Sequence, residues 1–265
     1  MTPLLHVDDV CKRFGALRVV DQFTFDVAEG EARGIVGPNG AGKTTLLNLV
    51  AGDLRPDSGT ISLAGQDITN LPAHVRCHRG IGRTAQIPRP FERLTVFENV
   101  LVGSTFGSRG RLSTSKEDAA VAALEQTGML DKANLLAGSL TLLDRKRLEL
   151  SRALATQPTL LLLDEIAGGL TEGEVLDLVE TIKQIRTSGV SIVWIEHIVH
   201  ALLRVVDRMM AVDTGRKLIE GDPHEVMSSN EVRAVYLGDD LAVEDLSGDH
   251  MVGDTVDDAT VRESP

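Results

Sequence analysis

Residues 37–44, Gly-Pro-Asn-Gly-Ala-Gly-Lys-Thr, have the types and spacing of a phosphate-binding loop. Glycines let backbone N–H groups turn toward an anion, and the positive end of a following helix adds to the attraction. Lys43 would reach the β- and γ-phosphates of a nucleotide, and the Thr44 hydroxyl would hold Mg²⁺. The alternative is a glycine-rich turn that binds nothing. The expected phosphate-binding residues are Gly37, Pro38, Asn39, Gly40, Ala41, Gly42, Lys43, Thr44 and Thr45.

Two carboxylates, Asp164 and Glu165, follow a run of four leucines at 160–163. Such a run is typical of a strand buried on both faces, and strands of this type in α/β proteins present functional residues at their carboxyl ends. Downstream of a phosphate loop, Asp164 is suited to order a Mg²⁺ shell and Glu165 to polarise an attacking water. The alternative is a pair of solvated carboxylates at a strand terminus.

Two further residues are ambiguous from their types alone. His197 follows a second apolar segment, Ser-Ile-Val-Trp-Ile-Glu, and a lone histidine in that place is more often structural than catalytic. Phe14 stands just before a turn at Gly15 in a chain that is only 3% aromatic. Its ring could stack on a nucleotide base or pack in the core, and its type leaves both interpretations open.

The surrounding pattern predicts the elements that position these residues. A strand should end at Val36, and a helix should leave the loop over residues 44–50, where small and apolar residues recur at helical spacing. A helix over 172–187 should be capped by Thr171. The remaining elements expected are antiparallel strands at 4–10 and 17–27, strands at 60–64, 159–163 and 191–196, a hairpin at 208–212 and 217–220, and a short helix at 72–79.

The middle of the chain, residues 88–143, shows no strand pattern. Helical spacing over 95–101 and 116–127, the first opened by Thr95 with a capping glutamate three residues later, predicts an inserted helical lobe. The polar, glycine-rich stretch 107–114 is expected to be a mobile loop rather than a site, although its two arginines could bind phosphate.

Composition sets broad limits on the function. The 265 residues are 42% hydrophobic and 25% charged, and this length suits one domain or one domain with a sub-lobe. No apolar run approaches the ~18 residues of a membrane span, and the start lacks the basic region of a signal peptide, so we expect a cytosolic protein. Two cysteines in a chain of this length make a disulfide framework implausible. The net charge of −12 argues against a general nucleic-acid binder.

Most of that charge lies at the end of the chain, where residues 239–265 hold nine acidic residues and one arginine. A segment of this composition cannot bury enough apolar surface to offset the entropy of ordering it. We therefore expect a folded domain over 1–238 followed by a disordered acidic tail over 239–265. Truncation after Gly238 should leave activity and melting temperature close to those of the parent.

The motifs together resemble the ATP-binding subunits of ABC transporters. The loop at 37–44, Gln86, the pair Asp164 and Glu165, and His197 stand in the order of the Walker A, Q-loop, Walker B and H-loop segments of that family. Over roughly residues 3–238, the sequence also resembles the ATPases of bacterial branched-chain amino-acid importers, in stretches at 83–86, 147–150, 195–197 and 234–238.

This resemblance implies a fold and a set of partners. The fold would be an α/β P-loop NTPase: a RecA-like core with a mostly parallel sheet, an N-terminal antiparallel β subdomain and an inserted helical subdomain at about 88–143. ATP and Mg²⁺ would be the cofactors. The partners would be a second ABC ATPase subunit, integral membrane permease subunits and indirectly a solute-binding protein, with no nucleic acid. The implied location is peripheral, at the cytoplasmic face of the inner membrane.

The resemblance also implies residue roles. Phe14 falls where the family places an aromatic that stacks on adenine, and Gln86 where a side chain bridges Mg²⁺ and the helical lobe. His197 falls where an imidazole contacts the γ-phosphate. Glu165, His197 and Lys43 would be catalytic, and the metal would be held by Thr44, Gln86 and Asp164.

Four departures from the family pattern affect the expected activity. Ala85 replaces the usual aromatic, Ile166 replaces a proline, and 168–171 lacks the usual carboxylate or amide. The signature segment, which serves the ATP of the partner subunit, has neither of its glycines, and Asp144 in it would cap a helix over 145–155. We therefore predict a heterodimer with unequal sites. The signature residues here are Leu140, Thr141, Leu142, Leu143 and Asp144.

The reaction expected is ATP hydrolysis that powers an importer, for branched-chain or similar small amino acids. One alternative function is that of a soluble ABC ATPase of DNA maintenance. The net negative charge of residues 1–238 and the lack of a coiled-coil or zinc motif disfavour it. A second is a nucleotide-gated regulatory subunit with little hydrolysis. Copurification with membrane proteins would distinguish a transporter subunit from the first alternative. Steady-state phosphate release would distinguish it from the second.

Overall fold

The computed structural model describes residues 2–107 and 115–237, and its centre is a six-stranded sheet. The strand order is β10-β9-β3-β8-β7-β6, and β10 is antiparallel to β9 while the other neighbours are parallel. This agrees with the expected α/β class. The strands are β3 (Ala32–Val36), β6 (Ile81–Arg83), β7 (Leu160–Asp164), β8 (Ser191–Ile195), β9 (Arg208–Asp213) and β10 (Arg216–Gly221).

Strands β3, β7 and β8 are buried along their whole length because helices cover both faces of the sheet. Side chains alternate between the faces with a period of two. In β7, Leu160 and Leu162 belong to one hydrophobic core while Leu161 and Leu163 belong to the other. The continuous leucine run is therefore explained by two cores that share one sheet.

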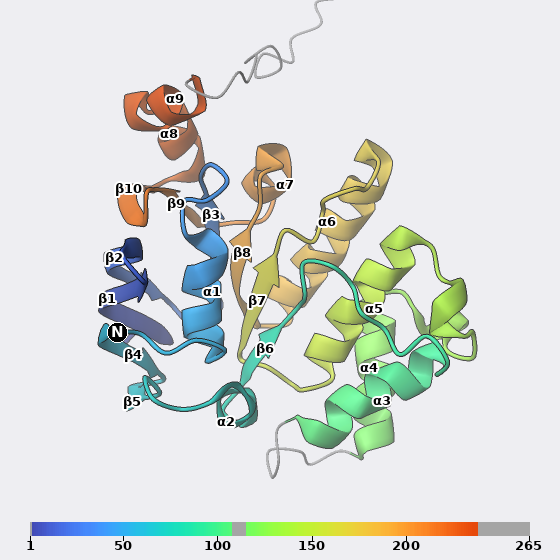
Figure 1. Cartoon of the computed structure of the whole chain (residues 1–265). Coiled ribbons are helices and arrows are strands. Elements are labelled where there is room, and N and C mark those ends of the chain that lie inside the picture. The colour runs from blue at the N-terminus through green and yellow to red at the C-terminus, as the bar shows by residue number, and fades with distance from the viewer. Residues whose placement is uncertain (1, 108–114, 238–265) are drawn as a thin grey trace, which may run out of the picture.

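A second sheet, at the left of Figure 1, is antiparallel and has the order β2-β1-β4-β5. Its strands confirm the antiparallel pair expected near the N-terminus. Helix α1 (Lys43–Ala51) lies between the two sheets, and its leucines share one core with residues of both. The strands are β1 (Leu5–Phe14), β2 (Leu17–Val27), β4 (Ser58–Leu63) and β5 (Gln66–Asp67).

On the far side of the parallel sheet, α3 (Val96–Phe106), α4 (Lys116–Gln126) and α5 (Leu142–Leu154) form a helical group (Figure 1). A Cβ added at Gly103 of α3 would lie 2.4 Å from the Arg152 carbonyl oxygen of α5, so these helices approach closely. Thr127 and Ser151 join the end of α4 to α5 through a 2.6 Å hydrogen bond between their hydroxyls. The helical group is therefore a packed unit beside the sheet.

Two predicted helix starts are confirmed. Thr95 and Thr171 each form a capping box, with Glu98 and Glu174 respectively. The second opens α6 (Glu172–Thr187), which packs on the sheet. The remaining helices are α2 (Ala73–His78), η1 (Leu130–Lys132), η2 (Ala137–Ser139), α7 (Val199–Leu203), α8 (Pro223–Ser228) and α9 (Asn230–Leu237).

One predicted helix start is wrong. The helix after the signature begins at Leu142 with Thr141 as its N-cap, not at Arg145 with Asp144 as its cap. The Thr141 hydroxyl accepts the Asp144 N–H at 3.3 Å, while the Asp144 carboxylate turns to the Lys132 ammonium. The ion pair with Lys132 therefore engages the Asp144 carboxylate, which was expected to cap the helix.

Two expectations fall on residues outside the described part of the chain. These are the loop predicted at 107–114, of which residues 108–114 with both arginines are not described, and the acidic tail predicted at 239–265. Among the residues that are described, no helix has the length and apolar character needed to cross a membrane.

Candidate functional site

The loop at 37–44 connects the buried strand β3 to helix α1, which is the expected strand, loop and helix arrangement. Two of its glycines have no room for a side chain. A Cβ at Gly37 would lie 2.1 Å from the Val212 carbonyl oxygen, and a Cβ at Gly42 would lie 2.4 Å from that of Val19. Both glycines also have positive φ, 152° and 96°. Neighbouring backbone therefore holds the loop against the start of α1.

Lys43 is 5% exposed and folds back over the loop. Its ammonium donates to the carbonyl oxygens of Gly37 at 2.7 Å and Pro38 at 2.9 Å. Burial lowers the pKa of Lys43, and the negative charges of Glu165 and Asp164 partly oppose that shift. A cation held beside two carboxylates and an inward-turned loop is placed to neutralise phosphate.

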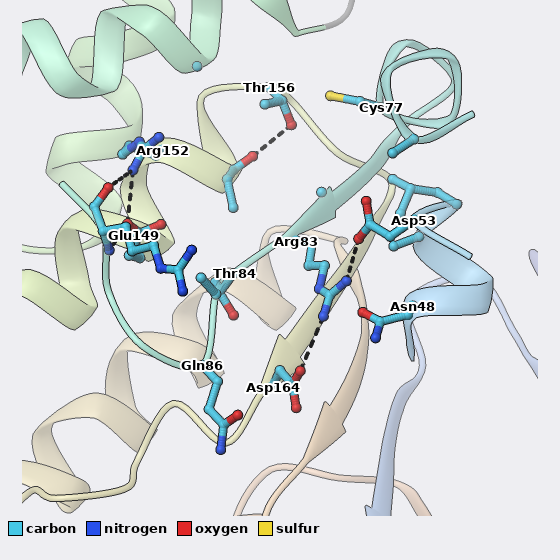
Figure 2. A pocket seen from close by; sticks show the side chains of 18 of the residues that line it. Asn48, Asp53, Cys77, Arg83, Thr84, Gln86, Glu149, Arg152, Thr156 and Asp164 are labelled. Atoms are coloured by element: carbon cyan, nitrogen blue, oxygen red, sulfur yellow. Dashed lines mark hydrogen bonds and ion pairs between the residues drawn. The ribbon is translucent and has the colours of Figure 1, made fainter. Parts of the chain in front are cut away.

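Asp164 ends strand β7 and faces helix α1, which follows the phosphate-binding loop (Figure 2). Its Oδ1 accepts the Thr44 hydroxyl at 3.3 Å, and its Oδ2 accepts the Arg83 guanidinium at 3.2 Å. Burial raises the pKa of Asp164, although the charge of Arg83 opposes the shift. The structure thus brings together the strand-end aspartate and the loop threonine that the sequence placed in one site.

The oxygen donors here fit a magnesium ion. The Thr44 hydroxyl and the Asp164 carboxylate are in contact, and an amide oxygen is present in Gln86, which lines the same pocket. Mg²⁺ prefers one or two carboxylates together with substrate phosphates and waters over a cage built from protein. The described residues contain no group of three or more His, Cys, Asp or Glu able to hold a metal.

Glu165 follows Asp164 in a left-handed backbone conformation, with φ of 47°. For a residue with a Cβ this conformation costs on the order of 1–3 kcal/mol, and such residues cluster at functional sites. Its N–H donates to the Ile195 carbonyl oxygen at 2.9 Å, and its carboxylate accepts the Gln86 side-chain amide at 2.6 Å. The strained turn and the amide together orient the carboxylate.

His197 lies just beyond β8 with a side chain that is 56% exposed. The residue before it, Glu196, is fully buried, and sequence reasoning missed it. One Glu196 oxygen accepts the Ala167 N–H at 2.6 Å and the other accepts the His197 N–H at 3.2 Å. Burial raises the pKa of Glu196 despite these donors and the nearby imidazole. This carboxylate ties the loop after β7 to the loop after β8.

A sequence signal for Glu196 was available. Glu196 follows a buried strand as Glu165 follows the neighbouring strand, and the carboxyl ends of parallel strands meet at one edge. Arg83 was also missed, because strand β6 is only three residues long and carries no comparable apolar run. Its place beside the site becomes visible only through its contact with Asp164.

Phe14 and the signature segment are not among the residues that line the pocket at Thr44 and Asp164. Phe14, at the end of β1, is 49% exposed, and the Lys12 ammonium lies 5.8 Å from its ring centroid. Leu142 is 43% exposed, and a Cβ added at Gly169 would come within 3.3 Å of its Cδ2. Asp144 is buried against Lys132, at 2.7 Å. Its carboxylate therefore faces its own chain.

The sequence and the fold both have known relatives. A family model described as ABC transporter matches residues 20–168. The chain is 36% identical over 251 residues to the high-affinity branched-chain amino acid transport ATP-binding protein LivG of Escherichia coli K12, with 89% of this chain and 98% of that protein covered. It is 35% identical over 238 residues to the lipopolysaccharide export system ATP-binding protein LptB of the same organism, with the same coverage.

Two solved structures have the same architecture. An ATP-binding cassette of an ABC transporter in its ADP conformation matches with a TM-score of 0.83 and 28% identity, over 90% of this chain and all of that one. A nucleotide-free cassette from an ABC transporter matches with a TM-score of 0.81 and 28% identity, over 89% of this chain and 99% of that one.

Proposed function

Because this chain belongs to the ATP-binding subunits of ABC transporters, we propose that it powers the import of branched-chain or similar small amino acids. The enzymatic activity of the family is ATP hydrolysis coupled to transport. The observation that carries the site assignment is the convergence of Lys43, Thr44, Asp164 and Glu165 at the carboxyl ends of β3 and β7. Support for the solute class comes from the similarity to LivG.

In the proposed reaction a water attacks the γ-phosphorus of ATP, its proton passes to the Glu165 carboxylate, and ADP and phosphate are released. Positioning and electrostatics are the main catalytic contributions in such transfers. Lys43 and the N–H groups of the loop stabilise charge on the phosphate oxygens, and bound Mg²⁺ neutralises more of it. Gln86 holds Glu165, and His197 contacts the γ-phosphate.

Lys43→Ala tests the binding step. The variant should lose affinity for ATP, because the ammonium that neutralises the phosphates is gone. Binding of a fluorescent ATP analogue to the full chain measures this, and Lys183→Ala, an exposed lysine on α6, is the matched control. Unchanged affinity in Lys43→Ala would remove the loop at 37–44 from the site.

We place the membrane subunit in a groove between the sheet and the helical group. The groove encloses about 750 Å³ and reaches from Thr44 and Asp164 at one end to α3 and α5 at the other. Two of its residues, Ile87 and Phe106, are 68% and 64% exposed. Apolar side chains presented to solvent beside a groove are typical of an interaction site. Because the chain belongs to a family of transporter subunits, the proposed location is peripheral, at the cytoplasmic face of the inner membrane.

Introducing a negative charge at these apolar side chains tests the placement. Ile87→Asp and Phe106→Asp should abolish copurification of the chain with integral membrane proteins while ATP binding is retained. Leu218→Asp on β10, an exposed leucine outside the groove, should copurify normally. Equal recovery of membrane proteins with all three variants would contradict the placement.

The solute requires a separate experiment because LivG and LptB are similar to this chain to nearly the same degree. The complex that copurifies should be reconstituted in vesicles with its solute-binding protein. Phosphate release stimulated by leucine, isoleucine or valine is the expected result. Stimulation by lipopolysaccharide instead would show an exporter of that class.

The second ATPase subunit is proposed to be a paralogue with an intact signature. The Asp144 carboxylate is turned to Lys132, so the remaining obstacles to phosphate are the bulk of Leu142 and Leu143 and the loss of glycine backbone. The Thr141 hydroxyl and the start of α5 remain available to an anion. Because this segment serves the partner's ATP, the site built on Lys43 should carry most of the hydrolysis.

The two Walker A lysines of the assembled transporter can be disabled one at a time. Loss of Lys43 should reduce phosphate release more than loss of the partner's lysine. Equal losses would contradict the asymmetry and would show that the leucine-rich signature makes a working phosphate contact.

A further inference from the structure

Arg83 lies where the groove and the metal-binding residues meet, and the reaction described above gives it no role. It ends strand β6, three residues before Gln86, and its side chain is 24% exposed. Figure 2 shows its guanidinium between two carboxylates that come from different elements. One is Asp53, just after α1, at 2.5 Å from Nη1, and the other is Asp164 at 3.2 Å from Nη2.

The two oxygens of Asp164 have different partners. Oδ2 accepts Arg83, whereas Oδ1 accepts the Thr44 hydroxyl. The side chain of Asp164 is only 2% exposed, so few other groups can reach it from solvent. A contact to Oδ2 fixes the rotation of the carboxylate and leaves Oδ1 on the side of Thr44, where the oxygen donors for a metal lie.

The planar guanidinium suits this arrangement. Its separate N–H groups can donate to two carboxylates at once in a fixed geometry, whereas an ammonium is a compact charge on a flexible stem. Asp53 holds the far side of the guanidinium and thereby limits its motion. The chain Asp53, Arg83, Asp164 therefore links the end of α1 to the end of β7.

We propose that Arg83 is a positioning residue for magnesium: it orients Asp164 so that Oδ1 and the Thr44 hydroxyl face one bound ion. The inference rests on the proposed function, because it presumes that a magnesium nucleotide binds at Thr44 and Asp164. Partners that orient a metal ligand change affinity for the metal without touching it. Arg83 would thus set the magnesium requirement of the site rather than its affinity for the nucleotide alone.

The experiment is a Mg²⁺ titration of binding of a fluorescent ADP analogue to the full chain, with a parallel series in EDTA. Arg83→Met should need about 10–100-fold more Mg²⁺ for half-maximal enhancement, the range found for other partners of metal ligands. Its affinity in EDTA should equal that of the parent. Arg83→Lys, which keeps the charge, should restore part of the effect and also serves if Arg83→Met folds poorly.

Asp53→Asn is the matched control, because it removes one anchor of the guanidinium and leaves the contact with Asp164. Its magnesium midpoint should shift less than that of Arg83→Met. A parental midpoint in both Arg83 variants would overturn the inference, as would an equal loss of affinity with and without Mg²⁺. A parent that shows no Mg²⁺ enhancement would overturn the proposed function as well, so the two failures are distinguishable.

Discussion

The two ends of the central sheet hold similar charged groups in opposite arrangements. At the amino end of β3, Arg33 is fully buried and donates to Glu31 at 3.0 Å and to Glu220 at 2.5 Å. At the carboxyl ends, Asp164 and Glu196 are also buried. The pKa of Glu220 is lowered, because Lys217 and Arg33 outweigh its burial, whereas burial raises the pKa of Glu196 and of Asp164.

The difference is whether cations of the fold compensate the buried carboxylates. At the amino end, cations of the fold neutralise the glutamates, and the cluster joins β3 to β10. At the carboxyl end, the carboxylates remain incompletely compensated, which is why their pKa values rise. Perturbed acids at strand ends are a feature of functional sites, and here they stand beside the phosphate loop.

The largest expected effect on stability is at the amino end. Arg33→Met would leave Glu31 and Glu220 without their buried partner, so the free energy of unfolding should fall by about 3–5 kcal/mol. ADP affinity per folded molecule should be unchanged. Urea unfolding with a parallel binding assay measures both. Arg208→Met is the control, because that exposed arginine also contacts Glu220 and should cost at most about 1 kcal/mol.

A large loss of ADP affinity in folded Arg33→Met would contradict the claim that the charged cluster at the amino end stabilises the fold without affecting nucleotide binding. So would a loss of stability no greater than that of Arg208→Met.

The two glutamates should also give opposite pH dependence. For Glu196 the folded pKa is raised, so its contribution to stability is full below its ordinary value of 4.5 and is lost as pH rises through the folded pKa. For Glu220 the folded pKa is lowered, so its contribution is full above 4.5 and is lost as pH falls through the folded pKa. The parent should therefore lose stability relative to Glu196→Gln on raising the pH above 4.5.

Relative to Glu220→Gln, the parent should instead lose its advantage on acidification below pH 4.5. Chemical denaturation of the three proteins across both windows separates the contributions. Slopes of the same sign for the two variants would contradict the assignment of compensated and uncompensated ends.

The smallest expected effect concerns helix α6, which follows the loop after Glu165. Thr171→Ala removes the capping hydroxyl of α6 and should cost about 1 kcal/mol of stability. Because α6 anchors the loop that begins at Glu165, phosphate release should also fall. Thr95→Ala removes an equivalent capping box in the helical group and should cost a similar amount of stability, with phosphate release by the assembled transporter unchanged. Equal effects of both variants on hydrolysis would remove α6 from this role.

The parts of the fold that depend on local pattern could be predicted. The leucine strand β7, the capping box at Thr95, the N-cap at Thr171 and the hairpin of β9 and β10 are confirmed. The start of α5 could not be predicted, because Thr141 and Asp144 are both good caps. The choice between them depends on Lys132, twelve residues earlier in the chain, which binds the Asp144 carboxylate.

The site divides in the same way. The roles proposed for Lys43, Thr44, Asp164 and Glu165 follow from motifs whose residues lie close together in sequence, and the structure brings these residues together. Arg83 donates to an aspartate 81 residues away, and Glu196 accepts an N–H from a residue 29 positions before it. Contacts of this kind follow from strand order, which the sequence pattern did not specify.

The most direct test of the account is steady-state phosphate release by Glu165→Gln in the assembled transporter. The variant should bind ATP as the parent does and should accumulate ATP-bound dimers. Its hydrolysis should fall by roughly 10²–10⁴-fold, the contribution of a general base. Glu172→Gln, an exposed glutamate at the start of α6, should hydrolyse ATP normally. Parental turnover in Glu165→Gln would contradict the assignment of the carboxyl-end cluster as the hydrolytic site.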